Sequence, residues 1–542
     1  MSRWFICLGI ASIMAACSQT VSASDDNEES SELSSSSQKK KSSSSESSDK
    51  KSSAKESDSK SSSSKGKNSS SSSAEKMDED CVGEPGNPWD GTTAKDFACG
   101  AGTKLSPYII LTAEQLAKLS FVVGSNDSDY QGKYYKLGAD IYLNEGDIID
   151  DKGALVADST KLHKWTPIGN SSVAFTGNFD GNNHTVSGMF VNTTSTHNGL
   201  FGNSSGTVQN VSLENSWVSG GKFTGGLVGY NTGTVEKLTN LASVSGKEEC
   251  VGGVVGDSYQ KNYSSNSVIK NVVNKGIVSG SSKVGGVAGC AASVTLDDAE
   301  NFSPIDGVGF VGGVVGIIGS SSRNEFKNLK NNGKITAKHF VGGISGLCGG
   351  NASYSKESSS YSCIEAYKCG SFSNAYNQGT VAGKRYVGGI SGVACSGTIS
   401  LLGNVADIEG EYGTAGVVGS ASYVTSKNLY NRGNIHGGDF VGGIFSYNKE
   451  GVTSAAYSTG KVDGDSLVGL MIGYNYNTTM ADYYYLEQDE QEPFGLNNGG
   501  GVATPKAAKE MQSKDFAELL GDEFVYDSGL NDGFPVLKWE KE

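Results

Sequence analysis

A short string of apolar and glycine residues recurs through the chain from residue 199 onward. Six copies read Val-Gly-Gly followed by Val or Ile, and four degenerate copies keep the apolar–glycine character. The second glycine, or its equivalent, stands at residues 199, 226, 253, 286, 313, 343, 389, 416, 443 and 470. Six of the nine intervals are 27 residues, and the other three are longer, as loop insertions would make them. A fixed period of this length predicts a solenoid of stacked coils.

A second motif lies upstream of each Val-Gly-Gly string. An Asn stands ten residues before the Val position, followed four residues later by Val or Ile and six residues later by Gly or Ala. The residues between vary freely, which is the two-residue period of a strand with one buried face. We therefore expect the Asn side chains of successive coils to align as an amide ladder with a repeat of about 4.8 Å. The predicted ladder contains Asn274, Asn301, Asn331, Asn377, Asn404 and Asn431.

These two motifs predict an all-β fold. Glycine and β-branched residues disfavour helix interiors, and the two-residue turns of a regular hairpin array are not evident. The fold class that fits is a parallel β-solenoid, or β-helix, of about ten 27-residue coils, capped at both ends. The glycine columns are expected at corners, where a positive φ or a close backbone approach is needed.

The chain outside the repeat divides into four further segments. Residues 1–16 have the pattern of a lipoprotein signal peptide, and Met14–Cys17 resembles a bacterial lipobox, so Cys17 is the predicted site of lipid attachment (palmitate). Residues 17–80 are rich in Ser, Lys and acids and are predicted to form a disordered linker. Residues 81–164 form the predicted N-terminal cap with a short helix at Thr112–Leu119, residues 165–480 the solenoid, and residues 481–542 the C-terminal cap.

One stretch of the repeat carries a family resemblance. Residues 226–235, with the sequence GLVGYNTGTV, resemble the GLUG repeat of bacterial surface proteins, and the similarity extends over about residues 199–475. The resemblance implies an adhesin-like surface lipoprotein. The residue after Cys17 is Ser18, which is similar to lipoproteins sent to the outer membrane, and the linker resembles those of secreted proteins from cellulose-degrading bacteria. The implied location is the outer membrane, lipid-anchored, with the solenoid surface-exposed or facing the periplasm.

Eight cysteines remain besides Cys7 and Cys17. An even number in an exported chain favours disulfides, and no CxxC or histidine-rich spacing indicates a metal site. The sequence suggests Cys81 with Cys99, Cys348 close to Cys395 on adjacent coils, and Cys363 with Cys369 inside the longest interval. Cys250 and Cys290 are left as the fourth pair.

Composition and charge narrow the function classes. The net charge is −15, so nucleic acid is not an expected partner. Polysaccharide-active enzymes also use β-helices, and Asp297, Asp298 and Glu300, or Asp180 near His184, could carry acid–base chemistry. Turn chemistry explains these acids more simply. We therefore expect no catalytic residue, no enzyme activity and no cofactor or metal.

Binding is the function that remains. Tyrosines on a rigid polar face could stack on sugar rings, although packing at corners or coil edges is the simpler explanation for any one of them. The candidates are Tyr230, Tyr376, Tyr386, Tyr430, Tyr474 and Tyr476. The sequence thus predicts a surface-anchored scaffold for adhesion or ligand binding, with a polysaccharide (plant polysaccharide, from the linker resemblance) or a surface protein as ligand. A lyase or hydrolase and a purely structural envelope protein are the alternatives.

Overall fold

The computed structural model describes residues 81–541, apart from 261–264, 355–358 and 489–490. The predicted signal peptide, the lipid site at Cys17 and the linker therefore lie outside the described residues. Within the described part of the chain, no helix combines the length and the apolar character needed to cross a membrane.

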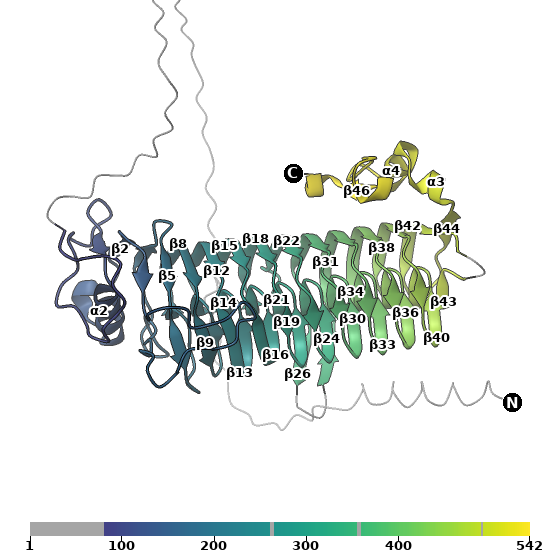
Figure 1. Cartoon of the computed structure of the whole chain (residues 1–542). Helices are drawn as coiled ribbons and strands as arrows, with labels where there is room; N and C mark the ends of the chain where they lie inside the picture. Colours follow the sequence, from purple (N-terminus) through teal and green to yellow (C-terminus); the bar gives the residue numbers. More distant parts are fainter. Residues whose placement is uncertain (1–80, 261–264, 355–358, 489–490, 542) are drawn as a thin grey trace, which may run out of the picture. The chain divides into compact units, whose positions relative to one another are not determined.

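The repeat folds as a parallel β-solenoid (Figure 1). One sheet has 25 strands and another 17, and the strands of each pair in parallel with those of the next coil. The stack has about 13 turns rather than the predicted ten. The number is higher because the stack begins before the first glycine string: Tyr108–Ile110 already pairs in parallel with Tyr134–Leu137, inside the predicted N-terminal cap.

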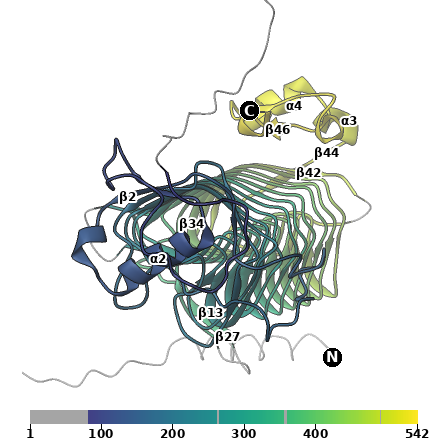
Figure 2. The ribbon, with the colours of Figure 1, turned by 60° about the vertical axis from the view of Figure 1, so that its left-hand side comes forward.

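Each coil contributes strands to three faces. Figure 2 shows the successive coils one behind another. The first face follows the Gly-Gly pair, and residues at equal positions in the repeat pair directly, as Val228 does with Val255. Its strands are β7 (Phe201–Ser204), β11 (Val228–Asn231), β14 (Val255–Tyr259), β17 (Ala288–Ala292), β21 (Val315–Ile318), β25 (Ser345–Cys348), β37 (Phe445–Lys449), β41 (Ile472–Tyr476) and β43 (Phe494–Asn498), with the first halves of β31 (Ser391–Asn404) and β34 (Val418–Asn431).

The second face ends at the ladder Asn in the seven coils from Asn240 to Asn431 and is called the ladder face. Its strands belong to the same 25-stranded sheet as the first face. They are β1 (Tyr108–Ile110), β2 (Tyr134–Leu137), β3 (Ile141–Tyr142), β4 (Asn178–Asp180), β5 (Thr185–Ser187), β8 (Thr207–Glu214), β12 (Thr234–Asn240), β15 (Ser267–Asn274), β18 (Val294–Asn301), β22 (Glu325–Asn331), β28 (Ser371–Asn377), β38 (Val452–Ser458), β42 (Thr479–Leu486) and β44 (Ala503–Lys506), with the second halves of β31 and β34.

The third face leads into the Gly-Gly pair and forms the 17-stranded sheet. Its strands are mostly short because a corner divides the face in most coils. They are β6 (Phe190–Asn192), β9 (Trp217–Gly220), β10 (Thr224–Gly225), β13 (Ser243–Gly252), β16 (Val278–Gly285), β19 (Ile305–Asp306), β20 (Gly309–Gly312), β23 (Ile335–Thr336), β24 (His339–Gly342), β29 (Val381–Ala382), β30 (Arg385–Gly388), β32 (Ile408–Glu409), β33 (Tyr412–Ala415), β35 (Ile435–His436), β36 (Asp439–Gly442), β39 (Val462–Asp463) and β40 (Ser466–Gly469).

The six predicted ladder asparagines align inside the coils, each fully buried. The Nδ2 of each donates to the Oδ1 of the next at 2.8–2.9 Å, and Asn240 adds one more member at the start. The sequence pattern missed Asn240 because a register irregularity between Gly246 and Glu249 makes its distance to Val251 one residue longer. These hydrogen bonds pair the buried Asn side-chain amides with one another, and burying the amides without partners would be costly.

The second glycine of each string packs against this ladder. A Cβ on Gly313 would lie 2.0 Å from the carbonyl oxygen of Gly343 and 2.4 Å from the Asn331 side chain. The same close approach recurs at Gly253, Gly286 and other members of the column. The prediction of close approach is therefore confirmed, but positive φ is not the reason for this column. Left-handed corners are instead filled by larger residues, such as Asn328 and Phe340.

The N-terminal helix is confirmed. Helix α2 (Ala113–Gly124) begins after Thr112, whose hydroxyl accepts from the Gln115 backbone N–H in a capping box. Its apolar side, including Leu116 and Leu119, is fully buried in the core of the first coils. A short 3₁₀ turn (Ser128–Tyr130) then leads into β2. The helix therefore supplies the cover that the first coil lacks on its outer side.

The C-terminal segment lies elsewhere than predicted. Its first strands, β43 and β44, still pair in parallel with the stack. The elements that follow are α3 (Ala508–Met511), α4 (Lys514–Leu520), β45 (Phe524–Val525), β46 (Val536–Leu537) and two 3₁₀ turns (Asn531–Gly533 and Lys538–Lys541). Rather than closing the end of the stack, they pack on the outer side of the ladder face, where Tyr430 and Tyr457 contact apolar residues such as Phe516 (Figure 1). The last two strands of the segment, β45 and β46, pair antiparallel with each other. The side chains of Tyr430 and Tyr457 point outward from the ladder face, and the C-terminal segment buries these two apolar rings.

The Glu540 side chain anchors this segment. It accepts a 2.8 Å hydrogen bond from the Tyr430 hydroxyl, and burial raises the pKa of Glu540 to about 7. Arg432 adds a 2.9 Å ion pair with Asp532 and lies over the ring of Phe534. The segment is therefore attached by an apolar cluster together with specific polar contacts.

Candidate binding surface

A line of outward side chains follows the corner between the third and first faces, and we call it the seam. One row of the seam is the residue before each Val-Gly position, such as Phe310 and Tyr386. The other row is the third residue of each first-face strand, such as Tyr230 and Tyr447. Because coils stack in register, equal positions come together along the stack. The seam is therefore a continuous surface whose chemistry changes from coil to coil.

The last part of the seam is aromatic and half-exposed, and we call it the aromatic strip. It lies on four adjacent coils, those of β30, β33, β36 and β40. Ring centroids follow one another at 5.6 Å from Tyr386 to Tyr412 and 5.2 Å from Tyr412 to Phe440. The strip comprises Tyr386, Tyr412, Phe440, Tyr447, Tyr474 and Tyr476.

Ring orientation changes sharply where the strip begins. Phe310, Phe340 and Tyr386 stack face to face, with interplanar angles of 4° and 6°. Tyr412 then stands at 88° to Tyr386, and Phe440 at 58° to Tyr412. The turn arises because Gly413 takes the left-handed position in this coil, so the aromatic residue sits one place earlier. Beyond Tyr386, neighbouring rings therefore meet tilted or edge to face rather than stacked in parallel.

Charges beside the strip largely cancel. Lys384 pairs with Glu411 at 2.6 Å, and Lys449 lies 3.7 Å from Glu450. The Arg385 guanidinium lies 5.1 Å from the centre of the Tyr412 ring. Burial raises the pKa of Tyr412 to about 12, so its hydroxyl is neutral at physiological pH. The surface thus offers rings with a polar, nearly uncharged surround.

The middle of the seam is covered by the insertion in the longest repeat interval. Phe310, Phe340 and Val393 form a buried cluster outside the main core, and Cys363 of the insertion packs against it. The insertion includes an antiparallel hairpin of β26 (Asn351–Tyr354) and β27 (Ser359–Ser362). The same seam that is partly exposed at Tyr412 is therefore buried by the chain itself on the three preceding coils.

The disulfides confirm two of the suggested pairs and correct the other two. Cys81 bonds Cys99 and Cys250 bonds Cys290, as predicted. Cys348 bonds Cys369, and Cys363 bonds Cys395, so the predicted proximity partners are exchanged. Successive strand residues point to opposite sides, and Cys348 faces the core whereas Cys395 faces the seam. Both bonds therefore tie the insertion to the coils, one inside and one outside.

An earlier part of the seam is charged. Lys283 donates to Glu249 at 2.5 Å, and Lys222 contacts the same carboxylate. Burial opposes ionisation of Glu249, but the hydrogen bonds from these two lysines lower its pKa overall. Burial raises the pKa of the neighbouring Asp257 to about 7. The cluster is accounted for by mutual pairing across adjacent coils.

The predicted tyrosines separate into three groups. Tyr386, Tyr474 and Tyr476 belong to the aromatic strip. Tyr430 is fully buried under the C-terminal segment, and Tyr376 packs against the same cluster, so neither is available to a ligand. Tyr230 packs with Phe223 and His197 at the beginning of the seam. Sequence reasoning missed Tyr412, Phe440 and Tyr447. The recurrence of Phe or Tyr directly before Val-Gly-Gly could have revealed Phe440, whereas Tyr412 is displaced by one residue and Tyr447 belongs to the other row.

Asp297, Asp298 and Glu300 lie within strand β18 rather than in the predicted turn, and most of the acids considered for catalysis have structural partners. Asp297 accepts from Asn328 Nδ2 at 2.8 Å and pairs with Lys327, and Glu300 accepts from Asn332. Asp180 accepts from the Asn182 backbone and from Asn210, which is the predicted turn chemistry. His184 pairs with Asp140 rather than with Asp180. These contacts give Asp297, Glu300 and Asp180 structural roles. The predicted pairing of Asp180 with His184 is not formed.

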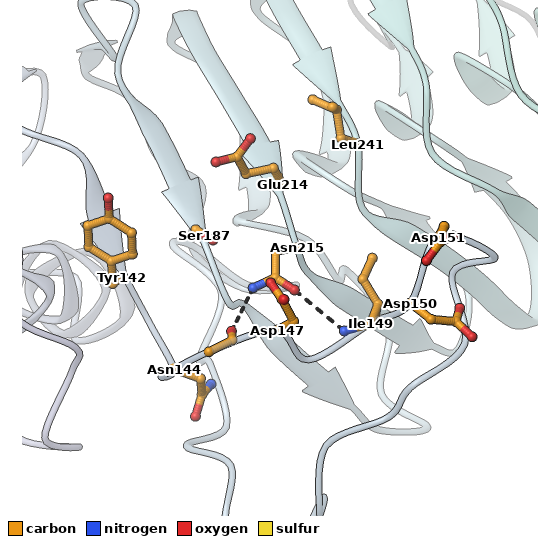
Figure 3. A pocket seen from close by; sticks show the side chains of 11 residues that line it. Tyr142, Asn144, Asp147, Ile149, Asp150, Asp151, Ser187, Glu214, Asn215 and Leu241 are labelled. Carbon is orange, nitrogen blue, oxygen red and sulfur yellow. Dashed lines mark hydrogen bonds between the residues drawn. The ribbon is translucent and has the colours of Figure 1, made fainter.

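An open depression of about 590 Å³ lies near the first coils (Figure 3). Asp147, Asp150, Asp151 and Glu214 contribute acids to its lining. Asn215 fixes the loop beneath them, because its Nδ2 donates to the Gly146 carbonyl at 2.8 Å and its Oδ1 accepts from nearby backbone N–H groups. Within residues 81–541, leaving aside the undescribed gaps, no group of His, Cys, Asp and Glu is arranged to hold a metal ion.

Comparisons with known proteins give partial similarities. No family model matches the chain. It is 32% identical over 173 residues to Halomucin of Haloquadratum walsbyi, a match covering 31% of this chain and 2% of that protein. It is 31% identical over 149 residues to a candidate Gly-rich membrane protein of Evansella cellulosilytica, covering 26% and 15% of the two chains. The chain therefore matches only a small fraction of either relative.

One solved structure is similar in part. It is a crystal structure from Bacteroides ovatus, named as a candidate immunoglobulin A1 protease, with 16% identity and a TM-score of 0.24. The match covers 82% of this chain and 98% of that one. At this TM-score the similarity carries no argument about function.

Proposed function

We propose that the chain is a surface-anchored, non-catalytic scaffold that binds a ligand for adhesion. The observation that carries the proposal is the aromatic strip, in which six half-exposed rings are held on four adjacent coils. The strip is rigid because the Asn ladder and the close glycine contacts fix each coil against the next. A preorganised surface loses little conformational freedom on binding, which favours affinity.

The proposed location is the cell surface. The lipobox-like Met14–Cys17 would supply a lipid anchor, and the GLUG-like repeat is typical of surface proteins. The similarity to a candidate Gly-rich membrane protein supports a membrane-associated or surface location. Anchoring at the outer membrane through Cys17 is part of this proposal.

The proposal is tested by retention on insoluble ligands. Purified full-length protein is mixed with a panel of insoluble polysaccharides and immobilised surface proteins, and the bound fraction and the released reducing sugars are both measured. We expect retention on at least one ligand well above that of heat-denatured protein, without sugar release above the blank. Sugar release would favour a hydrolase and overturn the proposal, and the absence of any retention would leave only a passive structural role.

A further inference from the structure

We infer that the aromatic strip binds a linear, uncharged chain of pyranose sugars that runs along the stack of coils. The inference rests on the proposed binding function and specifies its ligand class and its residues. Three properties of the strip carry it: the faces of the rings, their spacing, and the balance of charge around them.

The ring faces define where a sugar can bind. A pyranose ring presents a face of C–H groups that packs on the face of an aromatic ring, much as bases stack on aromatic side chains. In the Phe310–Phe340–Tyr386 stack the faces are filled by neighbouring rings. From Tyr412 onward the angles are 41° to 88°, so no ring lies parallel over its neighbour, and the Arg385 guanidinium lies over one face of Tyr412. Sugar stacking is therefore assigned to the rings of the strip beyond Tyr386.

The spacing fits a polymer better than a single sugar. Ring centroids follow at 5.2 Å from Tyr412 to Phe440 and 5.4 Å from Tyr447 to Tyr474. These distances follow from the strand repeat of about 4.8 Å and are close to the length of one sugar unit in an extended chain. Three steps between four coils span roughly 15 Å, enough for three to four units. Successive rings would therefore meet successive sugars.

The charge balance favours a neutral chain. Lys384 with Glu411 and Lys449 with Glu450 form opposite-charge neighbours. Arg385 and Asp439 occupy equivalent positions on the coils either side of Tyr412, so they too are of opposite sign. A uronate or phosphate polymer would meet no net positive charge here. Sugar hydroxyls, in contrast, can both donate to and accept from such mixed side chains.

The test uses paired variants of the full-length protein. The probes are soluble hexamers of β-1,4-linked glucose, β-1,4-linked mannose and galacturonate, and binding is measured by calorimetry. We expect at least one neutral hexamer to bind. The double variant Tyr412→Ala/Tyr474→Ala should bind it at least tenfold more weakly. Tyr412→Phe/Tyr474→Phe keeps both rings and should stay within about threefold of wild type.

A control at a distance separates stacking from a general loss of folding. Tyr134 is half-buried on β2, far along the stack from the strip, and Tyr134→Ala should leave sugar binding unchanged. Thermal unfolding of each variant shows whether it is folded. Equal affinity of the double Ala variant and wild type, or tighter binding of galacturonate, would overturn the inference.

Two further outcomes separate this inference from the proposed function. If wild type binds neither neutral hexamer but is retained on another ligand of the insoluble panel, the sugar inference fails and the binding function stands. If the panel retains nothing, the binding function itself fails. A dimer in solution that the double Ala variant dissociates would show that the strip is an interface between copies, and would also overturn the inference.

Discussion

Replacing Gly313 by Ala is expected to destabilise the solenoid by about 3 kcal/mol or more, the upper end of the cost of overpacking a core. A Cβ at this position would lie 2.0 Å from the Gly343 carbonyl oxygen and 2.4 Å from the Asn331 side chain. One of these neighbours is backbone of the next coil and the other is a ladder amide fixed by hydrogen bonds. Neither can move without breaking the register, so the strain spreads to both coils.

The midpoint of urea unfolding measures this effect, and Gly319→Ala is the matched control. Gly319 lies in the same coil, but its Cβ would meet only the Ala292 Cβ at 3.0 Å and a carbonyl at 3.6 Å. We expect the control to change stability by less than about 1 kcal/mol. Equal midpoints for the two variants would show that the glycine column is not held by close contact with the ladder.

Replacing Asn331 by Ala is expected to cost about 3–5 kcal/mol, because it removes two ladder hydrogen bonds from the buried interior. Asn331 accepts from Asn301 Nδ2 and donates to Asn377 Oδ1, both at 2.8 Å, and it also bonds the backbone of Gly333. The side chain is fully buried, so water cannot replace these bonds without entering the core. The loss falls in the middle of the ladder, where both neighbours depend on it.

The next residue supplies the control for this prediction. Asn332 also forms side-chain hydrogen bonds to adjacent coils, with Glu300 and Gln378, but these lie on the outer surface. Asn332→Ala should therefore lower the free energy of unfolding by no more than about 1 kcal/mol. If the two Asn variants were equally stable, the buried amide ladder would not be a main source of stability.

The interior of the solenoid was predictable because it repeats. Asn, Val and Gly recur at fixed offsets, and stacked coils bring equal positions together, so the ladder from Asn274 to Asn431 followed from spacing alone. Asn240 obeyed the same rule to Val244 and Gly246, but an irregular register hid its distance to the next string. A local bulge changes the number of residues between the Asn and the Val-Gly-Gly string. Spacing then fails to identify the Asn, although its side chain makes the same ladder hydrogen bonds.

The contacts on the outer surface were harder to predict, because they join segments that are not related by the 27-residue repeat. The exchange of partners between Cys348 and Cys395 depends on which side of a strand each faces, which offset counting ignored. The burial of Tyr430 depends on a segment more than a hundred residues later, through Glu540. The strip itself was partly visible, since Tyr386, Tyr474 and Tyr476 were candidates, but the turn of Tyr412 arises from Gly413 in its coil.

The central feature of the fold is the in-register stacking of adjacent coils, and pairs of engineered cysteines can measure this register. Ser279 and Asp306 are register partners on adjacent coils, whereas Thr336 lies one coil further. Neighbouring strands lie about 4.8 Å apart, within reach of a disulfide, and two spacings exceed it. We expect Ser279→Cys/Asp306→Cys to form an additional disulfide by peptide mapping and Ser279→Cys/Thr336→Cys to form none. The reverse pattern, or bonding in both, would contradict the in-register stack.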